Sequence, residues 1–416
     1  MKHSRPRKIQ RRARLLGYAL LSSIGAAGNF TGHFPRLRGY QPTIPLPLRT
    51  VPLHASGGTH HVHVYVGSPP QRQTLIVDTG SRLMAFPCQP CRACGTHVSK
   101  YFNPQLSTTD RRPACGACLL PGVSTCSTFN TDCIITQKYT EGSSWTAHEI
   151  EDLVWLGSER KEPSYEDYMK LAVPYAFGCQ TSEQGLFQKQ YADGILGLSI
   201  HQSSFVQALA DSNSIPRNSF SLCMNREGGT LSLGGAKSEP DMSYTDIARK
   251  HGWYAVEVTE LKLNDHCVAC TNSTELLPFH MGKGSIIDSG TTDTYLPKKI
   301  APQFEQAWNL MTGMKYAERK RSYTYAEYEL LPKIHLLFRG GANLTIFPEN
   351  YMEGIPKIVP WSSRVQLVNR IYVDEPEGAV LGANAMMGHE LYFDTQGNRV
   401  GIARSACVDD SKASNQ

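Results

Sequence analysis

A short pattern that occurs twice constrains the fold of this chain more than any other feature. An apolar run ends in Asp-Thr-Gly-Ser at residues 75–81 (LIVDTGS), and a second ends in Asp-Ser-Gly-Thr at residues 285–291 (SIIDSGT). Each copy is followed far downstream by an apolar-apolar-Gly triplet, Ile195-Leu196-Gly197 and Val380-Leu381-Gly382. The repeat predicts two similar halves, each of which contributes one Asp turn.

A single Asp-Thr-Gly is usually a β-turn at the end of a strand, where the Asp side chain bonds to the backbone. Two copies favour a different interpretation, because both have an apolar strand before them, a hydroxyl residue in fourth position and a triplet after them. We therefore take Asp78 and Asp288 as candidate catalytic residues.

Paired carboxyl groups suit the hydrolysis of a peptide bond. One carboxylate takes a proton from water while the other, protonated, donates to the carbonyl oxygen. Two carboxyl groups about 3 Å apart cannot both ionise, so they share one proton. The sequence therefore predicts that Asp78 and Asp288 form an acid–base pair that works under mildly acidic conditions.

The residues that follow each Asp are expected to hold the carboxyl groups in place. The two glycines permit tight turns close to the backbone of the other half. The hydroxyl residues next to each Asp are expected to exchange hydrogen bonds between the halves, and those in fourth position to reach the outer carboxylate oxygens. These supporting residues are Thr79, Gly80, Ser81, Ser289, Gly290 and Thr291.

The rest of the chain has the composition of an all-β protein. Short β-branched and aromatic runs are separated by Gly, Pro, Asn and Ser, while helical patterns are confined to residues 205–211 and 302–310. With 416 residues, the chain is long enough for two lobes. We place the lobes at 53–236 and 237–408, with the junction in the polar stretch after Gly234-Gly235.

The N-terminal residues have the pattern of a secretory signal. A basic segment precedes an apolar run that is shorter than the roughly 20 residues needed to span a bilayer. Residues 1–28 are therefore predicted to be a signal peptide or, alternatively, an uncleaved anchor, which would be the protein's only attachment to a membrane. Residues 29–52 are expected to be a short pro-segment or linker, and residues 409–416 a polar tail.

Cysteines and sequons point to an oxidising compartment in the secretory pathway or outside the cell. The chain has 12 cysteines, and three Asn-x-Ser/Thr sequons mark Asn29, Asn272 and Asn343 as glycosylation candidates. The net charge of +5 is concentrated near the N-terminus, so no nucleic-acid partner is expected. No cofactor is predicted, and a monomer that acts on polypeptides is expected.

The spacing of Cys91, Cys94, Cys115 and Cys118 also suits zinc. The neighbouring cysteines and the signal pattern favour disulfides instead, so no metal is predicted. Their pairing cannot be fixed from the sequence, and Cys179 is either a partner of this cysteine-rich segment or a free buried thiol. The cysteines without an assigned partner are Cys88, Cys91, Cys94, Cys115, Cys118, Cys126, Cys133, Cys179, Cys267 and Cys270.

From about residue 53 to residue 407, the sequence resembles the pepsin-like aspartic protease family. The motifs that carry the resemblance are VGSPPQ (66–71), DTGS (78–81), YADGILGL (191–198), FSLCM (220–224), DSGT (288–291) and LGANAMMGHELYFDTQGNRVGIARSAC (381–407). The resemblance implies two orthogonally packed β lobes, a cleft between them, and Asp78 and Asp288 as the catalytic pair. By likeness to β-secretase, it also implies a Cys223–Cys407 disulfide.

The family covers its substrate with a β-hairpin flap, and residues 138–145 (KYTEGSSW) resemble the β-secretase form of that flap. The resemblance makes Tyr139 the flap tyrosine and Trp145 its hydrogen-bonding partner. The cysteine-rich insert at 88–133 is similar to that of plasmepsin V-like and nepenthesin-like members. The chain departs from digestive pepsins at Ala85, where they have tryptophan, and at Arg82, which replaces a small residue and leaves the local shape of the cleft open.

The expected function is an aspartic endopeptidase that carries out limited processing of secretory-pathway proteins. The competing hypothesis is a catalytically silent binding protein on the same fold, as in plant xylanase inhibitors that resemble these proteases. Both Asp residues and their hydroxyl partners are present, which favours the enzyme. The short pro-segment further predicts activity without an elaborate maturation step.

Overall fold

The computed structural model describes residues 48–129, 131–157, 164–248, 252–270 and 276–408. The predicted signal peptide, most of the segment 29–52, the sequons at Asn29 and Asn272 and the tail 409–416 lie outside these residues. Asn343 is described and exposed. Among the described residues, no helix has the length and apolar character needed to cross a membrane.

The first three strands bring the chain to Asp78. β1 (Arg49–Ser56), β2 (Thr59–Val66) and β3 (Gln71–Asp78) pair antiparallel in sequence order. Gly57 and Gly58 form the first turn with φ of 59° and 81°, values that favour glycine. β1 begins four residues before the expected boundary at residue 53, because it pairs with β11 from Arg49 onward.

The remaining strands of the N-terminal half complete a sheet around a buried apolar core. β7 and β8 are long and pair antiparallel over most of their length, and β9 lies between β3 and β4. These strands are β4 (Met84–Pro87), β5 (Thr125–Cys126), β6 (Cys133–Lys138), β7 (Ser144–Leu156), β8 (Val173–Gln184), β9 (Gly194–Gly197), β10 (Ser219–Asn225) and β11 (Gly228–Leu233).

The C-terminal half contains three smaller sheets. The strand orders are β13-β16-β24-β17-β23, β15-β14-β19-β20 and β18-β22-β21. Their members are β13 (Ala255–Val256), β14 (Val258–Leu263), β15 (His266–Ala269), β16 (Ser285–Ile287), β17 (Thr294–Pro297), β18 (Arg321–Tyr323), β19 (Ile334–Phe338), β20 (Asn343–Ile346), β21 (Met352–Glu353), β22 (Val365–Asn369), β23 (Ile371–Glu375) and β24 (Ala379–Leu381). The structure confirms the all-β prediction.

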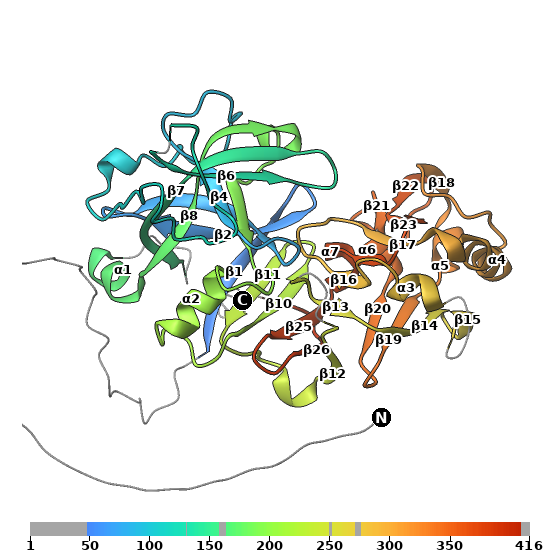
Figure 1. Ribbon diagram of the computed structural model, residues 1–416. Helices are drawn as coiled ribbons and strands as arrows, with labels where there is room; N and C mark the ends of the chain where they lie inside the picture. The colour runs from blue at the N-terminus through green and yellow to red at the C-terminus, as the bar shows by residue number, and fades with distance from the viewer. Residues whose placement is uncertain (1–47, 130, 158–163, 249–251, 271–275, 409–416) are drawn as a thin grey trace, which may run out of the picture. The chain divides into compact units, whose positions relative to one another are not determined.

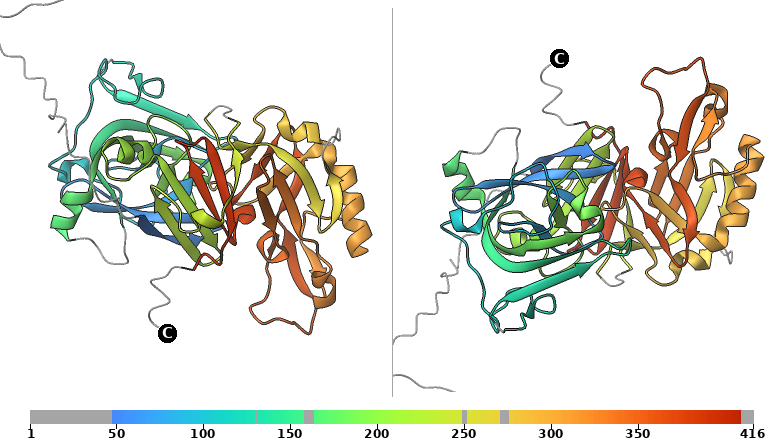
Figure 2. Two further views of the ribbon diagram at one scale, coloured as in Figure 1. Left: turned by 90° about the horizontal axis from the view of Figure 1, so that it is seen from below. Right: turned by 90° about the horizontal axis from the view of Figure 1, so that it is seen from above.

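A sheet of 14 strands joins the two halves. Its order runs β12-β26-β25-β10-β11-β1-β2-β3-β9-β4-β8-β7-β6-β5. Three of its strands come from the C-terminal half, namely β12 (Ser243–Asp246), β25 (His389–Asp394) and β26 (Arg399–Arg404). The last two are drawn in red, and β25 lies beside β10 of the first half, with β26 on its other side (Figures 1 and 2).

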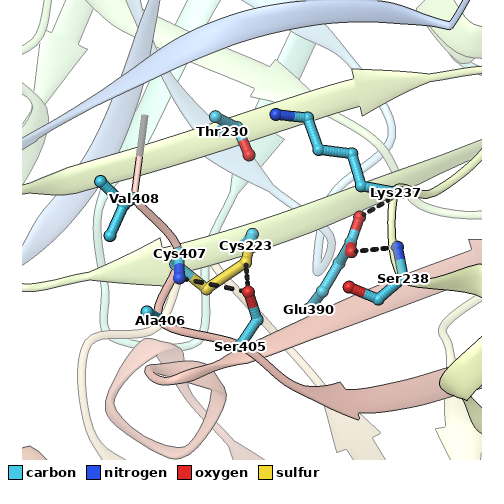
Figure 3. Close-up of a pocket in the computed structure, with 9 residues that line it drawn as sticks. All are labelled: Cys223, Thr230, Lys237, Ser238, Glu390, Ser405, Ala406, Cys407 and Val408. Carbon is cyan, nitrogen blue, oxygen red and sulfur yellow. Dashed lines mark hydrogen bonds between the residues drawn. A yellow bond between two sulfur atoms is a disulfide. The ribbon is translucent and has the colours of Figure 1, made fainter. Parts of the chain in front are cut away.

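Buried polar contacts hold this junction together. Glu390 on β25 accepts hydrogen bonds from the Lys237 amide at 2.9 Å, the Ser238 amide at 2.8 Å and the Ser221 hydroxyl at 2.6 Å. Beside it, the Cys223–Cys407 disulfide borders a pocket of about 260 Å³ (Figure 3). The carboxylate and the disulfide therefore both fasten the C-terminal strands to β10 and to the chain that follows β11.

Helices are short and lie where the sequence leaves the strand pattern. The two predicted helices are present as α2 (Phe205–Asp211) and α4 (Ala301–Thr312), and α4 ends at Gly313 with φ of 66°. The other α-helices of the described residues are α1 (Tyr165–Leu171), α3 (Leu277–His280), α5 (Tyr325–Glu329), α6 (Pro348–Tyr351) and α7 (Ala383–Met386).

Candidate active site

Two equivalent strand pairs deliver Asp78 and Asp288. β3 runs parallel to β9, so that Asp78 pairs with Gly197, and β16 runs parallel to β24, so that Ile287 pairs with Leu381 just before Asp288. A Cβ on Gly197 would lie 2.4 Å from the Leu83 nitrogen. A Cβ on Gly382 would likewise lie 2.1 Å from a backbone oxygen. The glycine of each triplet is thus required where the backbone passes close beside an Asp turn.

Each Asp carboxyl group packs against the glycine of the opposite turn. A Cβ on Gly80 would lie 2.6 Å from the Asp288 carboxyl atoms, and a Cβ on Gly290 would lie 2.3 Å from Asp78 Oδ1. The same glycines donate their amides to the Asp of their own turn, at 2.8 Å for Gly80 to Asp78 and 3.0 Å for Gly290 to Asp288. The structure therefore brings the two predicted carboxyl groups together.

Thr79 and Ser289 lock the turns to each other. The Thr79 amide donates to Ser289 Oγ at 3.1 Å, and the Ser289 amide donates to Thr79 Oγ1 at 2.9 Å. Each hydroxyl also donates across the junction, from Thr79 to Ile287 O and from Ser289 to Val77 O, both at 2.8 Å. Both residues are fully buried, so these four bonds are shielded from water.

The residues in fourth position differ between the turns. Thr291 Oγ1 donates to Asp288 Oδ2 at 2.7 Å, as expected from the sequence. Ser81 Oγ is buried and has no hydrogen bond of normal geometry among the described residues. Burial raises the pKa of Asp78 and of Tyr139, and the Ser81 hydroxyl opposes that rise. The sequence symmetry of the two turns is therefore not matched by their hydrogen bonding.

Burial distinguishes the two carboxyl groups. Asp78 is only 5% exposed, whereas Asp288 is half-buried. Burial raises the pKa of Asp78 well above its ordinary value, and the negative charge of Asp288 raises it further. The two carboxyl groups therefore differ in environment, which is what an acid–base pair requires.

The predicted flap residues lie at the turn between β6 and β7. Trp145 Nε1 donates to the Tyr139 hydroxyl at 3.2 Å, and the Tyr139 ring packs on Phe187 at 5.0 Å between centroids. Burial raises the pKa of Tyr139, and the charge of Asp78 raises it further. The Tyr139 hydroxyl therefore stays protonated, within electrostatic reach of the Asp pair.

An apolar row crosses the five-stranded sheet beside Asp288. Ala255, Ile286, Val380, Tyr295 and Tyr372 are in register on successive strands. Ile286 lies on β16 (Ser285–Ile287), and Asp288 follows directly after the end of this strand. The first three residues form a small cluster with Tyr295 and with Trp253, separate from the main core.

Trp253 is a site residue that the sequence reasoning missed. Its indole Nε1 donates to the Gly80 carbonyl at 2.9 Å, which links the C-terminal half to the first Asp turn. Because 173 residues separate donor and acceptor, no local pattern indicates the bond.

The cysteine-rich insert is a network of disulfides. Cys223 pairs with Cys407, as the resemblance implied, and the four cysteines with zinc-like spacing are divided among three disulfides. Cys179 pairs with Cys88 and is not a free thiol. The remaining pairs are Cys91–Cys94, Cys115–Cys126, Cys118–Cys133 and Cys267–Cys270.

A buried polar contact that the sequence did not reveal attaches the insert to β8. His97 Nε2 lies 3.1 Å from the Glu183 carboxylate and also contacts the Cys94 carbonyl, while Nδ1 lies 3.3 Å from Ala192 O. Glu183 is opposite Trp145 in the β7–β8 pairing. The His97–Glu183 contact therefore supports β8, the strand that pairs with the flap tryptophan on β7.

Two family models together match most of the chain. A family model described as xylanase inhibitor N-terminal matches residues 60–235, and one described as xylanase inhibitor C-terminal matches residues 253–404. Plasmepsin V of Plasmodium falciparum is 33% identical over 186 residues, which are 44% of this chain and 30% of that protein. Aspartyl protease family protein 1 of Arabidopsis thaliana is 25% identical over 383 residues, 86% of this chain and 69% of that protein.

Aspartic proteinase nepenthesin-2 of Nepenthes gracilis is 27% identical over 275 residues, which are 63% of this chain and 58% of that protein. The match to plasmepsin V thus spans less than a third of that protein's length, whereas the Arabidopsis match extends over both halves of the chain.

Proposed function

The chain belongs to the pepsin-like aspartic protease family, and we propose that it is an active endopeptidase in which Asp78 and Asp288 activate a water molecule. The observation that carries this proposal is the contact of each carboxyl group with the glycine of the opposite turn, held by the reciprocal Thr79–Ser289 bonds. This arrangement positions two acids on a single reacting centre.

The different environments of the two acids suggest their roles. Asp78, whose pKa is raised, holds the shared proton and donates it to the carbonyl oxygen of the peptide bond. Asp288, which is more exposed, takes a proton from the water molecule. At the same time, the oxygen of that water bonds to the carbonyl carbon. The resulting tetrahedral diol collapses when Asp288 passes its proton to the amide nitrogen, the C–N bond breaks and one diol hydroxyl returns its proton to Asp78. The products are an amine and a carboxylic acid, and Asp78 again holds the one proton of the pair.

The flap and the apolar row suit a polypeptide substrate. An extended peptide between them gains backbone hydrogen bonds, and side-chain pockets provide the selection. Tyr139 shields the reacting centre from bulk water. The row of Ile286, Val380 and Tyr295 beside Asp288 is suited to an apolar substrate side chain.

We place the enzyme in the secretory pathway or outside the cell. All 12 cysteines are paired in six disulfides, which form and persist in oxidising compartments. We propose limited processing of polypeptides rather than general digestion. We propose a monomer that attaches to a membrane only if its N-terminal segment is retained.

The alternative is a protein that binds its target without cutting it, as the description of the matching family models allows. The decisive experiment incubates purified protein with a diverse peptide library at about pH 4–7, with and without pepstatin. We expect site-selective cuts that fall by about 10²–10⁴-fold in Asp78→Asn and in Asp288→Asn.

Asp265→Asn is the matched control, since this Asp is exposed at the turn between β14 and β15. It should cleave like the wild type. A well-folded wild-type protein that cuts nothing in this library would favour the binding protein. Cleavage that survives either catalytic-pair substitution would disprove the mechanism.

A further inference from the structure

Three histidines gather on one face of the β1–β2 hairpin, away from the Asp pair's own residues. His54 on β1 lies directly opposite His61 on β2, and His63 follows two residues later on the same face. The His54 ring lies 5.6 Å from the His61 ring and 4.7 Å from the His63 ring, measured between centroids. The hairpin therefore presents three imidazoles within one small area.

We propose that His54, His61 and His63 form a binding site for a transition-metal cation such as Zn²⁺. Imidazole nitrogen is a preferred ligand for zinc, and three histidines with a water in the fourth position are a known zinc environment. In a tetrahedral site, nitrogens about 2.0–2.1 Å from the metal would set neighbouring ring centroids about 5 Å apart. The two measured separations lie on either side of that value.

The backbone already has the arrangement that such a site requires. Side chains directly opposite on antiparallel strands have Cβ atoms about 4.5–5.5 Å apart, and alternate residues on one strand share a face. In the structure the rings stack at 26° and 27°, so ligation requires rotation about side-chain bonds.

Solvent access and the neighbouring charges also affect how a cation would bind to the three histidines. His54 and His63 are half-buried, so a cation from solvent can reach the cluster, while His61 is 4% exposed and its Nδ1 has no hydrogen-bond partner among the described residues. Burial, His54 and Arg72 all act against positive charge at His63, and the Asp193 carboxylate acts in its favour. Arg72 is exposed, so water screens its repulsion.

A metal at this site would fasten β1 to β2. The turn of the same hairpin contacts the second Asp loop, because a Cβ on Gly58 would lie 2.8 Å from Thr292 Cγ2. Metal loading is therefore expected to raise the melting temperature. The proposal does not depend on peptidase activity, because its measurements are binding and stability.

The test uses full-length protein without an affinity tag, treated with a chelator and titrated with ZnCl₂ by calorimetry at about pH 7.5, where histidine is neutral. We expect one equivalent of Zn²⁺ per chain and a rise in melting temperature. Binding should weaken by at least roughly tenfold in His54→Gln and in His63→Gln. Co²⁺ should give the visible absorption of a nitrogen-ligated site in the wild type and in the control variant described below, but not in the two cluster variants.

His266→Gln is the matched control, because His266 is exposed on β15, outside the cluster. It should bind like the wild type. Melting temperatures and circular dichroism without metal establish that each variant is folded, and having two independent cluster variants keeps the test valid if one of them is not. The proposal is overturned if wild-type protein binds no Zn²⁺, or if both cluster variants bind it as tightly as His266→Gln.

Discussion

Thr79 and Ser289 each accept a hydrogen bond from the other's backbone amide, although 210 residues separate them in the chain. The exchange is reciprocal because the two Asp turns have the same backbone conformation and face each other. Neither hydroxyl has access to water. Removal of either hydroxyl should therefore weaken the pairing of the two halves more than it weakens either half alone.

We expect Thr79→Val to lower the free energy of unfolding by about 1–3 kcal/mol, because it leaves the Ser289 amide and the Ile287 carbonyl without their partner in a buried place. Urea denaturation measures the loss. Thr125→Val is the control, since Thr125 is exposed on β5. In a double-mutant cycle with Ser289→Ala, additive effects would contradict the coupling of the two turns.

Substitution of Gly80 by Ala should disturb the dyad directly. The new methyl group would overlap the Asp288 carboxyl group, so that one reacting group must move. We expect peptidase activity to fall by about 10²-fold or more, because small displacements of reacting groups have effects of that size. Gly235→Ala, which meets only the end of the Leu48 side chain, should retain activity.

The raised pKa of Asp78 predicts a pH-dependent gain in stability for Asp78→Asn. A carboxyl group whose folded-state pKa is raised binds its proton more tightly in the folded protein, so it opposes folding as pH rises above its unfolded value of about 3.9. Asp78→Asn should therefore be more stable than the wild type near neutral pH, and the difference should shrink as pH falls towards that value.

Urea denaturation of both proteins at several pH values would measure this difference. A constant difference across the range, or a gain confined to acid pH, would show that Asp78 is not a buried acid with a raised pKa. The same titration predicts that peptidase activity declines as pH rises through the pKa of Asp78, since the pair then loses its shared proton.

His97→Gln should loosen the cysteine-rich insert. Burial opposes the charge on His97, but the hydrogen bond and charge of Glu183 outweigh it and raise the His97 pKa. Burial also raises the pKa of Glu183. A histidine with a raised pKa stabilises the fold below its unfolded value of about 6.5, and this contribution is lost as pH rises through the folded value.

The ion pair therefore exists in mildly acidic to neutral solution. There we expect His97→Gln to cost on the order of 3 kcal/mol, because Glu183 is left buried without its partner. Limited proteolysis within residues 88–133 should quicken correspondingly. Equal proteolysis of variant and wild type at about pH 5–6 would show that the pair does not hold the insert.

The sequence was sufficient to predict the features that repeat or that follow local rules. The Asp turns, the two triplets and the helix at Phe205–Asp211 all have short-range signals. The hydrogen bond between Tyr139 and Trp145 was predicted by resemblance. The two residues lie six positions apart within one hairpin. The start of β1 at Arg49 was not, since a Pro-rich stretch gives little strand signal.

Long-range contacts outside the repeated turns and the motifs of the resemblance could not be predicted. The Trp253–Gly80 bond and the His97–Glu183 contact join residues far apart in sequence, and either partner alone is an ordinary residue of its type. The disulfides of the insert were also undetermined, because the zinc spacing and several pairings suit the same cysteines. The difference between Ser81 and Thr291 arises from packing around two turns of nearly identical sequence.

The sheet that joins the halves has a consequence for the order of events during synthesis. β10 has its partner β25 only after residue 394 has emerged from the ribosome, and Cys223 meets Cys407 later still. The first half is thus translated well before one edge of its sheet can be covered. Until then, other chains can pair with that exposed edge. Chaperones that bind exposed strands would have the longest time to bind the chain in this interval.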